Sequence, residues 1–229
     1  MNSPVLTIDG PSGVGKGTVA RVIAQQQGWH LLDSGAIYRA FALAVESRGV
    51  SITDEKSLEE IATNLDLAFK THADSELVSV FLDGKDVSKV LRTEETGEKA
   101  SKIASIGVVR AALLKRQQDF ATLPGLVADG RDMGTVVFAN APFKVYLTAS
   151  ADERANRRLK QLQAQGSKGI ISQILVDVKA RDERDSSRKH SPLKPAKDAL
   201  IIDTTTLSLD EVIAQVSEMV KAEAVKLYK

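Results

Sequence analysis

The segment from residue 10 to residue 18, with the sequence GPSGVGKGT, constrains the fold of this chain more than any other. It follows a short apolar run, Val5–Asp9, that is typical of a buried strand, and it leads into Lys16–Gln27, where apolar residues recur at helical spacing. Glycines let successive backbone N–H groups turn toward an anion, and the start of a helix adds a favourable dipole. The order of strand, glycine-rich turn and helix therefore predicts a phosphate-binding loop.

The loop matches the pattern G-x-x-x-x-G-K through Gly10, Gly15 and Lys16, and Lys16 would place a positive charge on the β- and γ-phosphates of a nucleoside triphosphate. It departs from the strict pattern at Gly17, where a Ser or Thr usually places its hydroxyl directly on Mg²⁺. We therefore expect the hydroxyl of Thr18, one residue later, to contact Mg²⁺ through a water molecule instead. The competing interpretation, a glycine-rich turn with a chance lysine, disagrees with the flanking strand and helix. The residues expected to bind ATP here are Gly10, Pro11, Ser12, Gly13, Val14, Gly15, Lys16, Gly17 and Thr18.

Strand and helix patterns alternate along the rest of the chain. The alternation predicts an α/β fold of three layers, with a parallel sheet between helices and binding sites at the carboxyl ends of the strands. Ser150 and Ser208 are each followed three residues later by Glu, which predicts two capping boxes. We expect one P-loop NTPase domain over residues 1–229. The predicted strands are Val5–Asp9, Trp29–Asp33, Gly125–Asp129, Phe143–Leu147 and Ala199–Asp203, and the predicted helices cover 16–27, 36–46, about 94–119, 150–165, 170–185 and 208–226.

Two segments depart from this alternation. Leu65–Lys70 and Glu76–Leu82 have strand patterns and are followed by Asp83-Gly84, a hairpin turn signal, so residues 60–92 are predicted to form an insert with a small antiparallel sheet. Within residues 154–170, a short polar segment flanked by two glycines joins two predicted helices. This arrangement indicates a short mobile lid. A plain turn between helices is the alternative for this second segment.

Composition limits the possible partners and compartments. The chain has 31 basic and 30 acidic residues, a balance that argues against nonspecific binding of nucleic acid. It has no cysteine, so disulfides and thiolate metal sites are excluded, and its three histidines are isolated from one another. No signal peptide or membrane-spanning apolar run is evident. We expect a cytoplasmic monomer that binds neither nucleic acid nor membrane.

Four further segments narrow the family: residues 31–39 (LLDSGAIYR), Asp86–Ser88 with Arg92-Thr93, residues 128–135 (ADGRDMGT) and Arg181–Arg188. The phosphate loop resembles that of adenylate-kinase-like nucleoside monophosphate kinases, and all five segments together resemble the bacterial cytidylate kinases over nearly the whole chain. The resemblance implies that ATP, with Mg²⁺, phosphorylates CMP and dCMP to CDP and dCDP. It also implies that the insert at 60–92 is a CMP-binding subdomain.

Arginines are concentrated where a second anion would bind. A kinase that acts on a nucleotide must hold the acceptor phosphate and neutralise the transferred group, and the planar guanidinium suits both tasks. If 178–188 is helical, Arg181, Arg184 and Arg188 share one face, although a solvated helix end with an Arg181–Asp185 pair is the simpler alternative. The proposed catalytic residues are Lys16, Arg131, Arg181 and Arg188, and Arg157 and Arg158 are assigned to ATP.

The base must be distinguished from uracil. Cytosine offers an N4 amino donor, for which a carboxylate is the natural acceptor, and we assign Asp132 to it. By resemblance, Ser101 and Arg110, on one predicted helix, donate to N3 and O2, with ordinary exposed helix residues as the alternative. The resemblance also assigns Ser34, Arg39, Arg181 and Asp185 to the acceptor nucleotide. The full set expected to bind CMP is therefore Ser34, Arg39, Ser101, Arg110, Arg131, Asp132, Arg181, Asp185 and Arg188.

Two aspartates at strand ends have open roles. Asp129 would serve as a Walker-B aspartate or would fix the loop of Arg131, and Asp33 would hold a magnesium water or only stabilise its turn. Two other functions are alternatives. The first is another kinase of this superfamily, acting on UMP, AMP or shikimate, and the second is a nucleotide-binding switch. The Asn-Lys-x-Asp and Asp-x-x-Gly motifs of switch GTPases are absent from the sequence.

Overall fold

The computed structural model describes residues 3–72, 75–164 and 166–227, and the chain divides into two compact units. The first unit contains the residues up to 32 together with those from 118 onward, and the second contains residues 33–117. Residues 73–74 of the predicted insert and residue 165 of the predicted lid lie outside the described part of the chain.

The first unit is built on a five-stranded sheet with the strand order β2-β6-β1-β7-β8. Strand β1 pairs in parallel with β6 and β7, and β7 pairs in parallel with β8. Every residue of β1 is buried, as expected of a strand covered on both faces. The five strands predicted for the sheet are confirmed. They are β1 (Val5–Asp9), β2 (His30–Asp33), β6 (Leu126–Gly130), β7 (Phe143–Thr148) and β8 (Leu200–Asp203).

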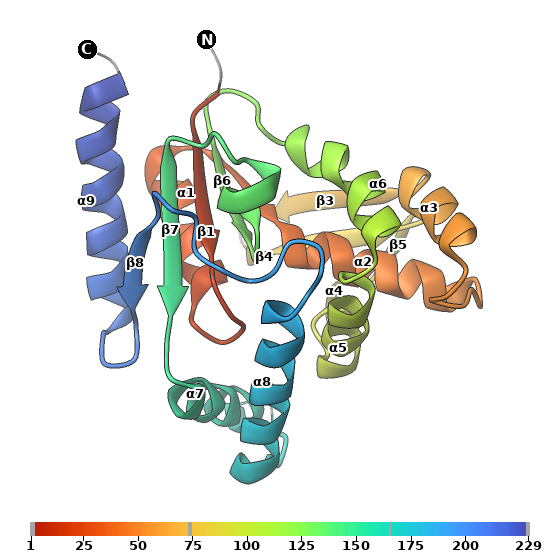
Figure 1. Cartoon of the computed structure of the whole chain (residues 1–229). Helices are drawn as coiled ribbons and strands as arrows, with labels where there is room; N and C mark the ends of the chain where they lie inside the picture. The colour runs from red at the N-terminus through yellow and green to blue at the C-terminus, as the bar shows by residue number, and fades with distance from the viewer. Residues whose placement is uncertain (1–2, 73–74, 165, 228–229) are drawn as a thin grey trace. The chain divides into compact units, whose positions relative to one another are not determined.

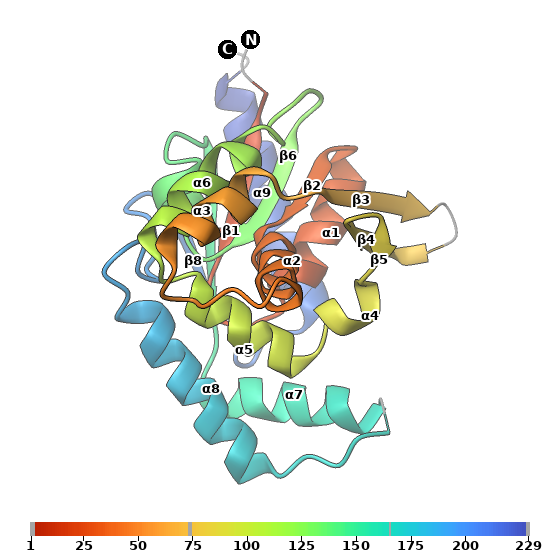
Figure 2. The same ribbon diagram turned by 90° about the vertical axis from the view of Figure 1, so that its right-hand side faces the viewer.

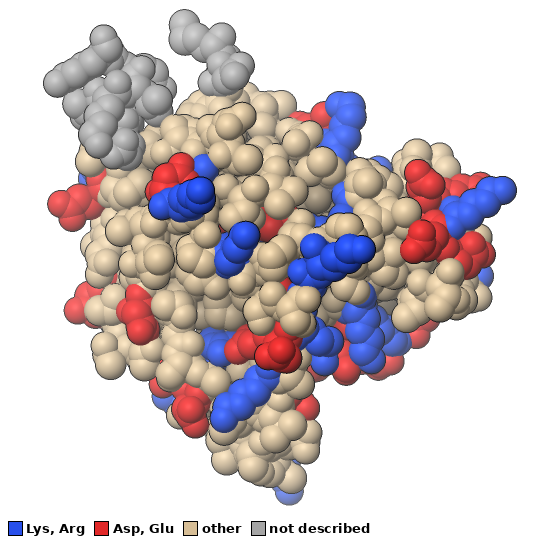
Figure 3. Space-filling view, in the orientation of Figure 1, with Lys and Arg blue, Asp and Glu red and all other residues tan. Residues whose placement is uncertain are grey.

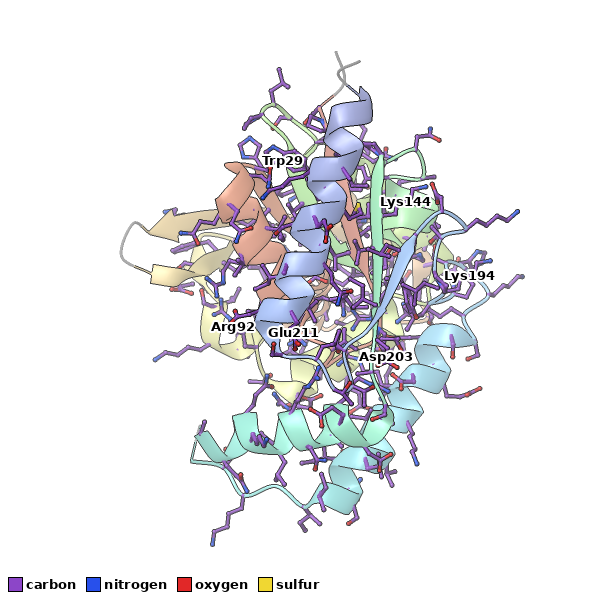
Figure 4. The ribbon with its side chains drawn as sticks, turned by 90° about the vertical axis from the view of Figure 1, so that its left-hand side faces the viewer. Trp29, Arg92, Lys144, Lys194, Asp203 and Glu211 are labelled. Atoms are coloured by element: carbon purple, nitrogen blue, oxygen red, sulfur yellow. The ribbon has the colours of Figure 1, made fainter. Side chains whose placement is uncertain are left out.

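Helices α1 (Lys16–Gln27) and α9 (Leu209–Leu227) pack against each other and on the same side of this sheet (Figure 1). Val19 and Ile23 of α1 and Val212 and Val216 of α9 are buried in one core with the apolar residues of β1 and β7. The capping box predicted for α9 is confirmed: the Glu211 carboxylate accepts the backbone N–H of Ser208 at 2.8 Å, and the Ser208 hydroxyl accepts that of Glu211 at 3.3 Å. Figure 4 shows Glu211 in the first turn of α9 and Asp203 at the end of β8.

Helices α7 (Ala151–Ala164) and α8 (Ile171–Ser186) lie side by side below the carboxyl ends of β1 and β7 (Figures 1 and 2). Their bounds agree with the predicted helices to within one residue. The Ser150 hydroxyl accepts the backbone N–H of Glu153 at 3.2 Å and caps the start of α7. The predicted reciprocal bond of a capping box is not formed, because the Ser150 N–H donates to Thr205 Oγ1 at 3.0 Å and the Glu153 carboxylate accepts from Arg157 Nε at 2.9 Å. Between β6 and β7 the chain forms η1 (Met133–Val137), a short π-helix that no periodicity predicted because it spans only five residues.

The second unit combines helices with the small antiparallel sheet predicted for the insert. Its strand order is β3-β4-β5, and Leu67 of β3 lies opposite Leu82 of β4. The turn between β4 and β5 has positive φ at both Asp83 and Gly84, which is the conformation that an Asp-Gly hairpin favours. The elements of this unit are α2 (Ser34–Ser47), α3 (Glu55–Thr63), β3 (Leu67–His72), β4 (Ser75–Leu82), β5 (Lys85–Asp86), α4 (Ser88–Leu91), α5 (Glu94–Ile103) and α6 (Gly107–Gln118).

The prediction of one helix over about 94–119 is wrong, because the structure has α5 and α6 with a break at 104–106. At the break the Ser105 hydroxyl donates to the Lys102 carbonyl at 2.7 Å, and Arg110 Nη1 donates to the Ala104 carbonyl at 3.1 Å. These side chains satisfy carbonyls that a continuing helix would have bonded internally. Ser101 and Arg110 are therefore on different helices.

In the described part of the chain, no helix has both the length and the apolar character that crossing a bilayer requires.

Candidate active site

The phosphate loop leaves β1 at Gly10 and enters α1 at Lys16. Gly10 has φ +147, and a Cβ built on it would lie 2.1 Å from the Leu147 carbonyl oxygen, so no other residue fits there. Gly15, the residue before α1, is left-handed and provides no side-chain cap. The first N–H groups of α1 thus begin without a side-chain acceptor, which is the arrangement that binds phosphate in loops of this kind.

Lys16 is buried, with 6% of its surface exposed, and its Nζ donates to the Pro11 carbonyl at 2.6 Å. Burial and the adjacent charge of Arg131 lower the pKa of Lys16 to about 7, while the charge of Asp129 raises it. Arg181 also lies close enough to lower it. The structure therefore gathers three of the four predicted catalytic cations at the phosphate loop, where a polyanion would relieve their mutual repulsion.

Asp9 connects the phosphate loop strand to the turn that follows β6. Its Oδ1 accepts the backbone N–H of Met133 and its Oδ2 that of Gly134, each at 2.8 Å. Burial raises the pKa of Asp9 to about 7, against the lowering effect of these two bonds. A side chain at Gly134 would clash, because its Cβ would lie 2.8 Å from Thr7 Oγ1. Asp9 thus holds in place the turn that carries Arg131.

The buried carboxylate of Asp185 pairs with two of the predicted catalytic arginines. Its Oδ2 accepts from Arg131 Nε at 3.1 Å, and its Oδ1 accepts from Arg188 Nη2. Two charge-assisted bonds fix both guanidiniums in orientation. The condition for Arg181, Arg184 and Arg188 to share one helix face, a helix that continues through 188, is not met, since α8 ends at Ser186 and Arg188 lies beyond it.

Two serines bond to carbonyls near the end of α8. The hydroxyls of Ser186 and Ser187 donate to the carbonyls of Asp182 and Glu183, each at 2.6 Å. The hydrogen bonds of Asp185, rather than helical spacing, bring Arg188 to the site. Basic and acidic side chains are intermixed around α8 in Figure 3, as such pairing requires.

Two more aspartates lie near the phosphate loop. Asp132 is buried, with 3% exposed, and its charge adds to the raising of the pKa of Asp9. A Cβ on Gly17 would lie 3.4 Å from Asp129 Oδ2, so this carboxylate borders the start of α1. Among the described residues, no group of three His, Asp or Glu side chains could enclose a metal ion. Mg²⁺ at nucleotide sites needs only one or two protein groups besides phosphates and waters, and the Asp129 carboxylate beside Gly17 is an oxygen donor of the kind that fits this demand.

Arg39 and Asp33 have clear structural contacts in the second unit. Arg39 Nη1 donates to the carbonyls of Leu91 at 2.8 Å and Thr93 at 3.3 Å. Gly97 leaves room for this guanidinium, because a Cβ there would lie 2.9 Å from Arg39 Nη2. Asp33 Oδ1 accepts the backbone N–H of Ala36 at 2.9 Å and caps α2, which is the structural role considered for it.

The other predicted residues of the second unit lie on three helices. Ser34, on α2, is buried and donates to Gln117 Oε1 at 2.8 Å, and Ser101, on α5, is also buried. Arg110, on α6, lies over the ring of Tyr38 at 5.6 Å, a cation–π contact. Sequence reasoning missed Gln117 and Tyr38, and the position of Tyr38 inside the LDSGAIYR motif was the signal that could have found it.

The two arginines assigned to ATP lie on α7. Arg157 Nη1 donates to the Val14 carbonyl of the phosphate loop at 3.4 Å and to Thr204 Oγ1 at 3.1 Å. Arg158 Nη1 donates to Gln161 at 3.4 Å. Arg154, on the same helix and 4% exposed, was not singled out by sequence reasoning, although its Nη1 reaches the Ser12 carbonyl at 3.3 Å. A charged residue on the buried face of an amphipathic helix was the available signal.

A central parallel strand, a glycine-rich loop and a buried lysine at the start of the next helix define a P-loop nucleotide-binding protein. Arginines beside such a loop are typical of a phosphotransferase, in which they neutralise the phosphoryl group during transfer.

Comparison with known proteins gives the family. The family model described as cytidylate kinase matches residues 6–222, and the chain belongs to the cytidylate kinase family. It is 52% identical to a cytidylate kinase of Aliivibrio salmonicida, over 97% of this chain and 99% of that protein. It is 54% identical to a cytidylate kinase of Photobacterium profundum, over 93% of each chain. Among solved structures, an uncharacterized protein from Eubacterium ventriosum shares the fold at 12% identity, with a TM-score of 0.51 over 96% of this chain and 99% of that one.

Proposed function

We propose that this chain transfers the γ-phosphoryl group of ATP to CMP and dCMP, giving ADP with CDP or dCDP. The observation that carries the proposal is the gathering of Lys16, Arg131 and Arg181 at the phosphate loop of a chain that matches the cytidylate kinase family from residue 6 to residue 222. The loop would hold the donor phosphates, and the arginines would neutralise the group in transfer.

In this mechanism the protein supplies position and charge and forms no covalent intermediate. Lys16 would bind the β- and γ-phosphates, while Arg131 and Arg188, oriented by Asp185, would face the transferred group and the acceptor phosphate together with Arg181. Arg157 and Arg158 are proposed to contact ATP from α7. When bound, Mg²⁺ would neutralise phosphate charge, and Thr18 and Asp33 are proposed to hold it through water.

The base would be selected by hydrogen bonding. Asp132 is proposed to accept from cytosine N4, and Ser101 and Arg110 to donate to N3 and O2. Uracil carries O4 in place of the amino group, so it would leave Asp132 facing another acceptor in a buried place. Ser34 and Arg39 are proposed to bind the remainder of the nucleotide.

Two segments are proposed to move. Residues 154–170 would act as a lid, whose movement lies beyond the contacts of Arg154 and Arg157 with the phosphate loop, and 60–92 as a CMP-binding subdomain, because the reaction must exclude water. Hydrogen exchange in both should slow when a bisubstrate analogue binds, and unchanged exchange in both would refute the lid. The chain is proposed to be a cytoplasmic monomer that binds no nucleic acid, and sedimentation at several concentrations tests its oligomeric state.

A coupled assay of ADP release tests the proposed function. CMP, dCMP, UMP, AMP and no acceptor are compared at equal concentration with ATP and Mg²⁺. CMP and dCMP should support the fastest release. Faster release with UMP or AMP would instead indicate another nucleoside monophosphate kinase, and release that no acceptor accelerates would favour a nucleotide-hydrolysing switch.

A further inference from the structure

Arg154 joins three parts of the first unit. Its Nε donates to the Ala149 carbonyl at 3.1 Å, and its Nη1 donates to the Ser12 carbonyl of the phosphate loop at 3.3 Å. Both terminal nitrogens bond to the Asp182 carboxylate, at 2.9 and 2.5 Å. The side chain of Arg154 is 4% exposed and that of Asp182 30% exposed. A bidentate pair of this kind has a defined orientation as well as strength.

The bond to Ser12 affects the loop amides. In a trans peptide the C=O and the following N–H point in opposite directions, so a donor behind the Ser12 carbonyl turns the Gly13 N–H to the other side of the loop. Gly13 itself packs against this arginine, since a Cβ there would lie 3.3 Å from Arg154 Cβ. One helical turn further along α7, Arg157 donates to the Val14 carbonyl in the same manner. Helix α7 therefore holds two peptide groups of the loop through their carbonyls, those that follow Ser12 and Val14.

Asp182 connects α7 and the phosphate loop to helix α8. It lies on α8, next to Arg181 and three residues before Asp185, whose carboxylate orients Arg131 and Arg188. The bidentate pair fixes α8 to α7, and the Ser12 bond fixes α7 to the loop. Through these contacts one carboxylate connects the donor-phosphate loop with the helix that carries Arg181 and Asp185.

We propose that Arg154 and Asp182 are positioning residues that preorganise the phosphate loop for triphosphate binding and hold α8 in register with it. The proposal rests on the proposed use of this loop for the phosphates of ATP. Neither residue is assigned to touch substrate, because the donors of Arg154 are directed at protein oxygens. The competing account is a plain structural link that stabilises the α7–α8 pair.

The variant Asp182→Asn tests the proposal with little change of shape, because it keeps one acceptor and removes the charge. Asp177→Asn is the matched control: Asp177 is exposed on the same helix, and its Oδ1 accepts from Gln173 Nε2 at 3.0 Å. Binding of ATP, inorganic triphosphate and CMP is measured by calorimetry, together with kcat, KM for each substrate and Tm.

Loss of a charged hydrogen bond predicts that Asp182→Asn weakens triphosphate and ATP binding by roughly tenfold or more and lowers kcat. Binding of CMP should change by less than about twofold, and Asp177→Asn should behave as wild type. A lowered Tm with unchanged triphosphate affinity would show a merely structural link and overturn the proposal. Because triphosphate binding is measured without an acceptor, this result is separate from a failure of wild-type CMP phosphorylation, which would count against the proposed function alone.

Arg154→Lys and the double variant complete the test. Lysine keeps the charge but loses the planar fork, so it cannot bond to the carbonyl and both carboxylate oxygens together. If Asp182 acts through Arg154, the double variant should bind triphosphate no worse than Arg154→Lys alone. Losses that add in full would mean that the two residues act independently, which contradicts the proposal.

Discussion

Two turns leave the carboxyl ends of neighbouring strands, the phosphate loop after β1 and the 131–134 turn after β6. The phosphate loop opens α1 without a side-chain cap, so its amides are presented to a ligand. In the second turn, the N–H groups of Met133 and Gly134 are taken by the Asp9 carboxylate. The first turn offers its backbone N–H groups to a ligand, and the second offers the side chains of Arg131 and Asp132. We propose that these two neighbouring turns divide the binding, with the first binding phosphate and the second selecting the acceptor.

The largest effect is expected from a change in the phosphate loop. Lys16→Ala removes the only side-chain charge that the loop itself supplies, and kcat should fall by at least about ten-thousandfold, which is roughly 5.4 kcal/mol of barrier. The measurement is steady-state turnover with saturating ATP and CMP, with Tm to confirm folding. Lys160→Ala, at an exposed position of α7, is the control. A kcat within about tenfold of wild type would remove Lys16 from the chemistry.

The next effect concerns the arginines that Asp185 holds. Arg188→Ala removes one guanidinium and leaves a buried carboxylate with less compensation, so kcat/KM for CMP should fall by about three orders of magnitude, as for arginines supplied to phosphoryl transfer. Arg48→Ala is the control, because Arg48 pairs with exposed Asp83 and such pairs contribute little. Wild-type kinetics in Arg188→Ala would contradict its proposed role.

Much of the first unit was predictable because its signals are local. The phosphate loop, the strands and the capping box of α9 depend on residues within a few positions of one another, and they agree closely with the structure. The break between α5 and α6 was missed because the carbonyls at the end of α5 are satisfied by the side chains of Ser105 and Arg110, and apolar spacing carries no record of such bonds. The contacts of Asp9, Arg154 and Asp182 join residues far apart in sequence, which one sequence cannot reveal.

A smaller effect concerns the carboxylate between the two turns. Burial raises the pKa of Asp9 from 3.8 to about 7, so the stability that its protonated form contributes is complete below pH 4 and is lost as the pH rises through 7. Asn does not titrate, and it can accept only one of the two N–H bonds. The stability gap between wild type and Asp9→Asn should therefore shrink from pH 5 to pH 8, by up to about 1.4 kcal/mol for each pKa unit titrated. Chemical denaturation at both values measures it, and a gap that does not depend on pH would show that Asp9 stays ionised.

The most direct test of the central claim, that the side chains of the second turn select cytosine, is the ratio of kcat/KM for CMP to that for UMP in wild type and Asp132→Asn. The amide can donate to uracil O4, so the ratio should narrow by about ten- to a hundredfold while ATP binding is kept. Equal losses with both substrates and an unchanged ratio would contradict the account, since Asp132 would then only support Arg131.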